Sequence, residues 1–174
     1  PDDSPARMKQ IERAVLLMND LPGINASASL EPGAASGTTR VVINAAEGPV
    51  FQGILSGDNY GDRYTGAYRG SGQILTYDPF GFGDQFSLSF TGAERMAQLR
   101  GSYALPLGST GFTWNTAYMG LTYELGKELT DLKAKGWASS ISTGISYPLI
   151  RSRNASLWTG MGIEYTMLVD KANG

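Results

Sequence analysis

The feature that most constrains the fold of this chain is a nearly unbroken two-residue alternation. Residues 136–147 place Trp137, Ile141 and Ile145 on one face, while glycine, alanine and serine fill the other. Successive side chains of a β-strand point to opposite faces, so this period predicts a strand. The small polar face could not build an ordinary core. An apolar face toward lipid and a polar face toward a wet interior are typical of a transmembrane β-barrel.

The alternation recurs along most of the chain and predicts seven strands. Several of them reach the ~9–11 residues that a tilted strand needs to cross a bilayer. Residues 85–91 and 96–105 have clearly separated faces, whereas the faces of 111–124 are ambiguous. The predicted strands are residues 50–57, 64–77, 84–92, 96–106, 111–124, 134–148 and 156–169.

The connectors between these strands are of two alternating kinds. Residues 78–83, 106–110 and 148–154 are rich in turn formers, and the other three connectors carry more charge. This order is typical of an up-and-down barrel with turns on one side and loops on the other. Seven strands are not expected to close, and unpaired edges are not tolerated in a membrane. Further strands are therefore expected after Gly174.

Residues 1–47 have a different pattern, that of a small α+β unit. Ser4 and Pro5 predict a helix start, apolar residues at helical spacing continue to Met18, and the helix is expected to stop near Asn19. Pro22 and Gly23 end the helix. Residues 24–30 and 38–45 then predict two short strands around a turn. The chain thus divides into 1–47 and 48–174.

Composition excludes several classes of function. The 174 residues contain no Cys and no His, so no thiolate metal site, no Ser-His-Asp triad and no imidazole base can be built from them. The net charge of −2 gives no basic surface for nucleic acid. We expect no catalytic residues, no metal and no cofactor, and no apolar run has the length of a membrane helix.

Five sequence blocks carry a resemblance to a known family. In order they are 12–23 (ERAVLLMNDLPG) with 30–33 (LEPG), 58–66 (DNYGDRYTG), 78–84 (DPFGFGD), 103–108 (YALPLG) and 147–153 (YPLIRSR). Each block alone is weak, but their order and spacing together are specific. The chain resembles the outer-membrane transporters of two-partner secretion, the TpsB or ShlB/FhaC/HecB haemolysin secretion/activation family. The resemblance spans essentially the whole chain.

The resemblance implies a mainly β fold. Residues 48–174 would be about seven strands of a larger antiparallel transmembrane barrel, preceded in 1–47 by the C-terminal part of a periplasmic POTRA domain. It implies a non-enzymatic protein of the Gram-negative outer membrane that moves an unfolded exoprotein to the cell surface without nucleotide. The expected partners are this passenger protein and outer-membrane lipid. A first POTRA domain, a plug helix and a returning arginine loop of the family have no counterpart here.

Two sets of candidate site residues follow. A free strand edge in the POTRA-like unit could add a passenger strand by β-augmentation, or the strand could simply pair within its own sheet. The residues assigned to this edge are Asn25, Ala26, Ser27, Ala28, Ser29 and Leu30. The second set lies on faces assigned to the barrel lumen, where it could line the conduit or pair structurally: Arg69, Gln98, Arg100 and Glu164.

Other features have simpler interpretations. Trp and Tyr near strand ends indicate an aromatic girdle, with a sugar-binding platform as the alternative. Arg151 and Arg153 are expected to be solvated or to face lipid headgroups. Rival functions are a barrel-assembly insertase of the BamA/TamA kind and a passive porin. A soluble β-sandwich is the rival fold.

Overall fold

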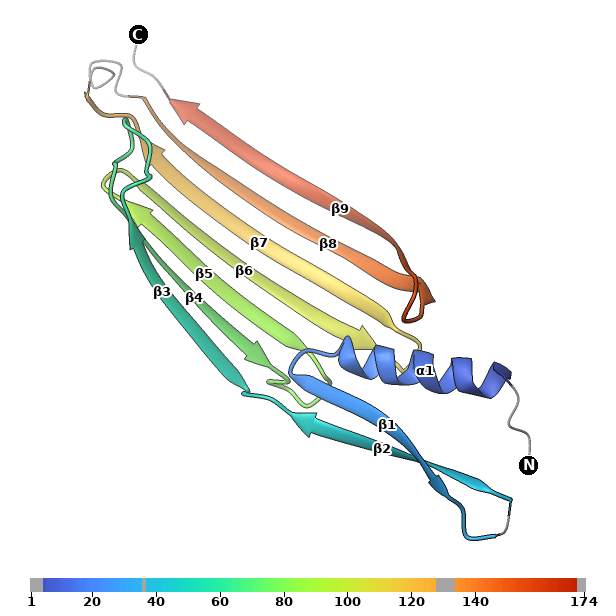
Figure 1. The fold of residues 1–174 in the computed structure, drawn as a ribbon. Helices are drawn as coiled ribbons and strands as arrows, with labels where there is room; N and C mark the ends of the chain where they lie inside the picture. Colours follow the sequence, from blue (N-terminus) through green and yellow to red (C-terminus); the bar gives the residue numbers. More distant parts are fainter. Residues whose placement is uncertain (1–4, 36, 128–133, 172–174) are drawn as a thin grey trace.

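The computed structural model describes residues 5–35, 37–127 and 134–171, which form one helix and two antiparallel sheets (Figure 1). In chain order the elements are α1 (Pro5–Asn19), β1 (Ile24–Pro32), β2 (Thr39–Glu47), β3 (Phe51–Asp58), β4 (Arg69–Tyr77), β5 (Gln85–Ala93), β6 (Met96–Leu107), β7 (Phe112–Glu124), β8 (Lys135–Arg151) and β9 (Ser156–Lys171). No described helix is long and apolar enough to cross a bilayer.

The predicted helix and hairpin of the N-terminal module are both present. The helix α1 ends at Asn19, as expected ahead of Pro22, and Gly23 turns the chain with a positive φ of 76°. The strands β1 and β2 pair over their whole length, from Ile24 opposite Glu47 to Pro32 opposite Thr39. Both strands run two residues beyond their predicted ends. The predicted capping residue Ser4 lies outside the described residues.

The seven predicted barrel strands are all present and form one meander in the order β3-β4-β5-β6-β7-β8-β9. Every neighbouring pair is antiparallel, so a single sheet curves through space with β3 and β9 at its two edges (Figure 1). The turns after β4, β6 and β8 lie at the end of the sheet that carries α1, β1 and β2, and the other connectors lie at the far end. This arrangement agrees with the predicted alternation of turns and loops.

Two predicted strand boundaries are wrong. The strand β8 continues to Arg151, although a turn was predicted from Pro148 onward. The sequence also predicted a strand over 64–77, but β4 begins only at Arg69. Residues before it form a loop, in which the amide of Gly61 donates to the Ala67 carbonyl (2.9 Å) and that of Gly66 to the Asp62 carbonyl (2.9 Å). Gly66 has a φ of 124°, a backbone conformation that other residues rarely adopt, so the loop could not continue as a strand.

The strand register separates the side chains into an apolar and a polar face. Cross-strand partners share a face, and Phe86, Tyr103, Thr116 and Thr143 are successive partners across the sheet. Phe90, Leu99, Tyr118, Ile141 and Ile163 fall on this same apolar face. The opposite face is polar or small, with Ser71, Ser89, Ser102, Ser142 and Gly162 among its members. Pairing also settles the ambiguous strand, because it places Trp114 and Tyr118 of β7 on the apolar face.

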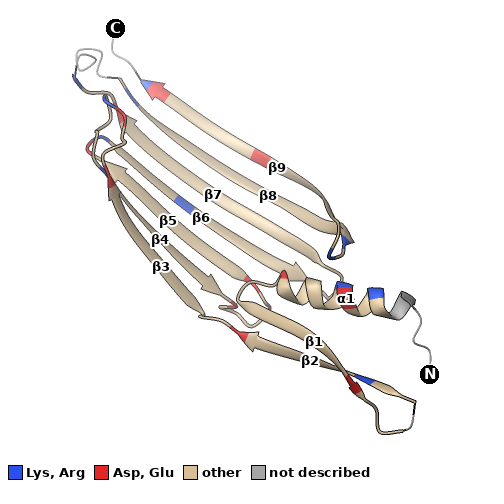
Figure 2. Ribbon diagram, viewed as in Figure 1, with Lys and Arg blue, Asp and Glu red and all other residues tan. Residues whose placement is uncertain are grey.

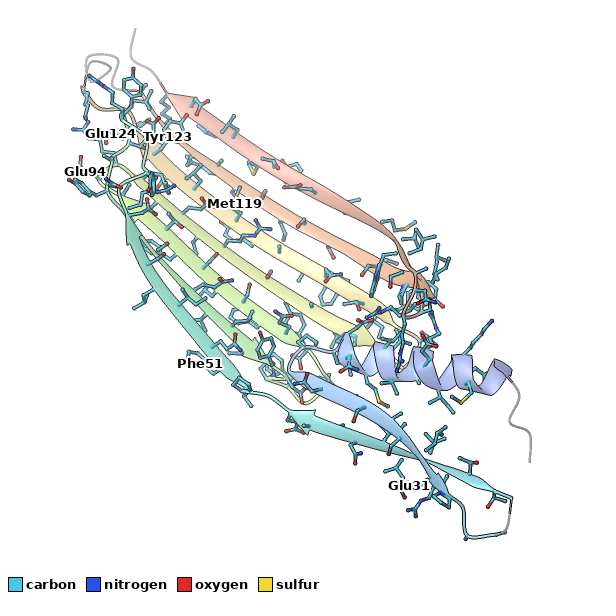
Figure 3. All side chains as sticks on the ribbon, viewed as in Figure 1. Glu31, Phe51, Glu94, Met119, Tyr123 and Glu124 are labelled. Carbon is cyan, nitrogen blue, oxygen red and sulfur yellow. The ribbon has the colours of Figure 1, made fainter. Side chains whose placement is uncertain are left out.

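No second layer of described secondary structure covers either face of the seven-stranded sheet, and its side chains project freely (Figure 3). Among the described residues, no apolar side chain larger than that of Pro148 is buried, whereas Ile163 is 76% exposed and Ile141 is 55% exposed. Strands of a soluble sandwich would bury one face against another sheet. An extended apolar face without a covering layer therefore contradicts the soluble β-sandwich interpretation and fits a wall that meets an apolar solvent.

A buried carboxylate holds the turn between β4 and β5. Asp84 is fully buried, and its carboxylate accepts hydrogen bonds from the Tyr103 hydroxyl (2.9 Å) and from the amides of Phe80 (3.3 Å) and Phe82 (3.4 Å). Burial alone would raise the pKa of Asp84, but these hydrogen bonds favour the charged form and bring its pKa below the ordinary value. The sequence motif at residues 78–84 (DPFGFGD) thus encodes a turn that Asp84 fixes.

Candidate functional site

The free edge of β1 is the first candidate site, and the hairpin's hydrogen bonds define which backbone groups it offers. The amide of Gly48 donates to the Gly23 carbonyl (2.7 Å), and the amide of Gly33 donates to the Thr38 carbonyl (2.7 Å). In an antiparallel pair, hydrogen-bonded positions alternate. Odd-numbered residues of β1 therefore direct their N–H and C=O groups toward β2, and even-numbered residues direct theirs to the outer edge.

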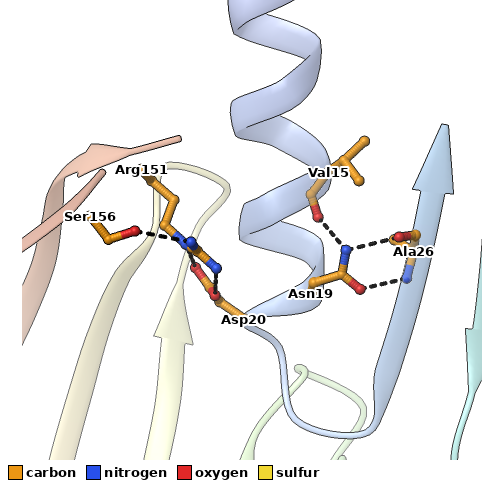
Figure 4. A network of polar contacts seen from close by, with 6 residues as sticks. All are labelled: Val15, Asn19, Asp20, Ala26, Arg151 and Ser156. Atoms are coloured by element: carbon orange, nitrogen blue, oxygen red, sulfur yellow. Dashed lines mark hydrogen bonds and ion pairs between the residues drawn. The ribbon is translucent and has the colours of Figure 1, made fainter. Parts of the chain in front are cut away.

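The side chain of Asn19 occupies one of these outward positions. Its Oδ1 accepts a hydrogen bond from the Ala26 amide (2.8 Å), and its Nδ2 donates to the Ala26 carbonyl (2.8 Å), as Figure 4 shows. Nδ2 also donates to the Val15 carbonyl (3.0 Å) in the last turn of α1. The side-chain amide of Asn19 thus makes the two hydrogen bonds to the Ala26 backbone that a neighbouring strand would make.

An apolar groove accompanies this edge. It lies between α1 and β1 and encloses about 470 Å³. Ile11 and Val15 line it from the helix, and Ala28 and Leu30 line it from the strand. Leu30 is 55% exposed although it is large and apolar. The edge therefore combines backbone hydrogen-bonding groups with an apolar surface, the two elements that recognition by β-augmentation requires.

Polar contacts anchor α1 and the residue that follows it to the end of β8 and the turn after it. The Arg151 guanidinium donates to both carboxylate oxygens of Asp20 (2.7 and 2.8 Å; Figure 4). Arg13 donates to the Pro148 carbonyl (2.8 Å), and the Arg153 amide donates to Glu12 (2.8 Å). Arg151 was expected to be solvated or to face headgroups, and this expectation is wrong: its paired side chain is only 20% exposed. The N-terminal module is thereby held against one end of the sheet.

The predicted lumen residues form the second candidate site. The register brings Arg69, Gln98, Arg100 and Glu164 to the polar face, but on three different strands. Arg69 pairs with Asp58 on the neighbouring strand (Nε to Oδ1, 2.9 Å). Within the described residues, Arg100 and Glu164 form no ion pair; the residue opposite Glu164 is Ser142. Arg69 thus has a structural partner, while Arg100 and Glu164 are charged groups available to another segment.

Charge is sparse along the strands and gathers at their ends (Figure 2). Aromatic rings cluster on the apolar face near the end that carries α1. Phe112 and Tyr147 stack with centroids 4.3 Å apart, and Tyr103 meets Trp114 edge-on at 6.2 Å. Trp158 instead lies on the polar face, opposite Pro148. The ring cluster fits the predicted girdle better than a sugar platform, because it lies at one height of the sheet.

The described residues hold no group of three or more His, Cys, Asp or Glu that could bind a metal ion. Sequence reasoning identified the β1 edge and the lumen face, but it missed Asn19, Asp84 and the Asp20–Arg151 pair. The sequence pattern predicts only that the helix ends at Asn19. Its position directly before an Asp-Leu-Pro-Gly turn, with an alternating strand behind it, was the one available signal.

An antiparallel meander with one uncovered apolar face, one polar face and an α/β module at one end defines the class of outer-membrane β-barrel proteins. The model of the haemolysin secretion/activation protein family ShlB/FhaC/HecB matches residues 37–168. The chain therefore belongs to this family, the two-partner secretion transporters. Membership confirms the resemblance that the five sequence blocks indicated.

Individual relatives agree with this assignment. The heme/hemopexin transporter protein HuxB of Haemophilus influenzae is 28% identical over 166 residues, which are 93% of this chain and 29% of that protein. The chain thus spans less than a third of the length of the curated relatives it matches.

Solved structures show the same fold. CdiB from Escherichia coli superposes with a TM-score of 0.78 at 17% identity, over 95% of this chain and 32% of that one. BamA from Haemophilus ducreyi lacking POTRA domains 1–3 gives a TM-score of 0.51 at 15% identity, over 94% of this chain and 29% of that one. At these identities the likeness concerns the fold alone.

Proposed function

We propose that this chain supplies the first wall strands and the adjoining docking module of a transporter that moves a secreted exoprotein across the Gram-negative outer membrane. One observation carries the proposal: a sheet with separated apolar and polar faces, in a chain that belongs to the two-partner secretion family. Residues 1–47 would be the end of a POTRA domain in the periplasm. Residues 48–174 would be the start of the barrel.

The polarity of the sheet supports this orientation. The exposed face that carries Phe90, Ile141 and Ile163 would contact lipid, and the face with Arg69, Gln98, Arg100 and Glu164 would line the conduit. Uncompensated charge is costly inside a bilayer, so Arg100 and Glu164 belong on the wet side. There they can bind a segment that enters the lumen or the passing exoprotein. The turn-rich connectors on the side of α1 support a periplasmic position for that module, because the turns of bacterial outer-membrane barrels face the periplasm.

Passenger recognition would use the outer edge of β1, within Asn25–Leu30. An extended segment of the exoprotein would add a strand there through backbone hydrogen bonds and place alternate side chains in the groove beside α1. Backbone recognition suits an unfolded passenger, because it requires no particular sequence. Transport would then need no nucleotide and no enzymatic residue. The relative HuxB is named a heme/hemopexin transporter protein, and we propose that the cargo of this chain is a secreted exoprotein.

A single backbone donor offers a test in the full-length protein. Ala28→Pro removes an outward N–H group but no hydrogen bond to β2, because the backbone groups of residue 28 point away from β2. The native Pro32 occupies an equivalent outward position in the same strand. Ala28→Ser is the matched control, since it retains the amide. We expect Ala28→Pro to lower exoprotein secretion strongly and Ala28→Ser to leave it near the parental level, with equal amounts of folded barrel in the membrane.

Deletion of the segment before Gly48 should abolish secretion but leave an inserted barrel. Normal secretion by that truncated barrel would refute the recognition role. An insertase would behave differently: its loss would deplete other outer-membrane barrels, and secretion would fall only as a consequence. Measuring exoprotein export and the levels of unrelated barrels in the same cells separates the two functions.

A further inference from the structure

We propose that Asn19 sets the register in which a passenger strand docks on β1. The inference rests on the proposed passenger docking at this edge. The Asn19 side chain already makes both backbone hydrogen bonds that Ala26 offers outward, at 2.8 Å each. A docking strand therefore finds Ala26 occupied and must begin its pairing further along β1.

The other end of the open edge is fixed by Pro32. Pro32 has the same outward orientation as Ala26, Ala28 and Leu30, but it has no N–H group to donate. At the helix side, the Ile24 amide donates to the Leu21 carbonyl (3.3 Å). Within the described residues, the outward amides that remain without a partner in β1 are those of Ala28 and Leu30. The open part of the edge, called the slot below, therefore consists of Ala28 and Leu30 and is bounded by Ala26 and Pro32.

Side chains beside the slot favour an extended apolar segment as its occupant. Ala28 and Leu30 line the groove together with Ile11 and Val15 of α1. A strand added next to β1 would direct every second side chain into this groove. The Asn19 amide closes the groove at the point where α1 and β1 converge (Figure 4). Asn19 thus acts as a positioning residue: it contacts β1, and through β1 it determines where the passenger begins to pair.

Two neighbouring serines allow this register to be read directly. Ser29 lies between Ala28 and Leu30 at the centre of the slot, whereas Ser27 lies between Ala28 and the occupied Ala26. Both serines are exposed; the lining of the groove includes Ser27 but not Ser29. Neighbouring strands lie about 4.7–4.9 Å apart, within the Cα separation that a disulfide bridges. The 174 residues contain no native Cys to interfere.

The experiment uses the full-length transporter with Ser29→Cys or Ser27→Cys. The probe is the N-terminal fragment of the exoprotein whose export depends on the transporter, carrying one cysteine at successive positions. We expect Ser29→Cys to form a disulfide readily and Ser27→Cys about fivefold less, the ratio that roughly one net hydrogen bond produces. Asn19→Ala should raise the Ser27→Cys yield to that of Ser29→Cys and shift the reactive probe position by two residues.

A merely structural role of Asn19 would give another pattern, because a loosened hairpin would lower both disulfide yields together. Asn19→Asp provides a second variant, since it retains the acceptor for the Ala26 amide but loses the donor to the Ala26 carbonyl; its Ser27→Cys yield should be intermediate. Equal yields at Ser27 and Ser29 that do not respond to Asn19→Ala would overturn the role of Asn19 alone. No disulfide at either position in any background would overturn the proposed docking as well.

Discussion

A charge placed on the apolar face of β8 should destabilise the barrel, whereas the same charge on its polar face should have little effect. Ile141 lies on the apolar face and is 55% exposed, and Ser142, the next residue, lies on the polar face directly opposite Glu164. Ile141→Arg would place a guanidinium toward the proposed lipid. Ser142→Arg would place the same group in the lumen within reach of a carboxylate. The two variants differ by one position in the chain and by the side of the wall.

The height of Ile141 in the membrane follows from the strand. It lies six residues from Lys135, the first residue of β8. At about 3.4 Å per residue and a tilt of about 40°, this is about 15 Å of height, near the middle of a band about 25 Å tall. Arg on the lipid face near the midplane costs about 2–4 kcal/mol. This free energy corresponds to an about 30- to 900-fold loss in the folding equilibrium.

The assay is reversible unfolding of the full-length barrel in lipid vesicles by denaturant, and tryptophan fluorescence monitors the transition. We expect Ile141→Arg to lose stability by the amount above and Ser142→Arg to remain within about 1 kcal/mol of the parent, as is usual for an exposed ion pair. Equal destabilisation by both variants, or a larger loss for Ser142→Arg, would refute the assignment of the two faces.

Three further predictions concern the wall and its attachment. Gly144→Ala should lower the yield of folded barrel in a membrane-insertion assay, because its Cβ would lie 2.6 Å from the Met161 carbonyl oxygen. Gly101→Ala is the control and should fold normally in that assay, since its Cβ would lie 3.9 Å from the nearest atom, Leu88 Cδ1. Asp84→Asn should destabilise the barrel by about 1–3 kcal/mol near neutral pH in denaturant titrations. The pKa of Asp84 in the folded protein lies below the ordinary ~3.9. The difference in stability between the parent and Asp84→Asn should therefore persist above pH ~4 and disappear as the pH falls through the folded pKa. A stability difference that is unchanged at low pH would contradict the role of Asp84 as a charged acceptor. Arg151→Ala should leave barrel stability nearly unchanged but speed proteolysis around α1, since it releases Asp20; unchanged proteolysis would show that this ion pair does not anchor the helix.

Much of the fold could be predicted because alternation is a local signal. Ile141 and Ser142 show their faces within one strand, and the register then confirms them. The strand β7 could not be assigned from sequence alone, because both of its faces mix types: Met119 and Leu121 lie on the polar face and Thr116 on the apolar one. Only the pairing of Tyr103 with Thr116 decides its orientation, and pairing is a property of two strands.

The details of the site depended on contacts that are distant in sequence. Arg151 pairs with Asp20, 131 residues away, and no local pattern marks either residue for the other. Asn19 contacts Ala26 only because the turn at Pro22 and Gly23 folds β1 back beside the helix. The start of β4 was misplaced for a related reason: the loop before it is held by hydrogen bonds such as that from the Arg95 amide to Thr65.

The solvent that adjacent positions of β8 contact tests the assignment of the two faces most directly. Spin labels at Ile141→Cys and Ser142→Cys in the full-length barrel, reconstituted in lipid, can be relaxed by oxygen dissolved in the bilayer or by a water-soluble nickel complex. With Ile141 toward lipid and Ser142 toward water, oxygen should dominate at position 141 and the nickel complex at position 142. The same solvent at both positions, or the reverse assignment, would contradict a wall with lipid on one face and water on the other.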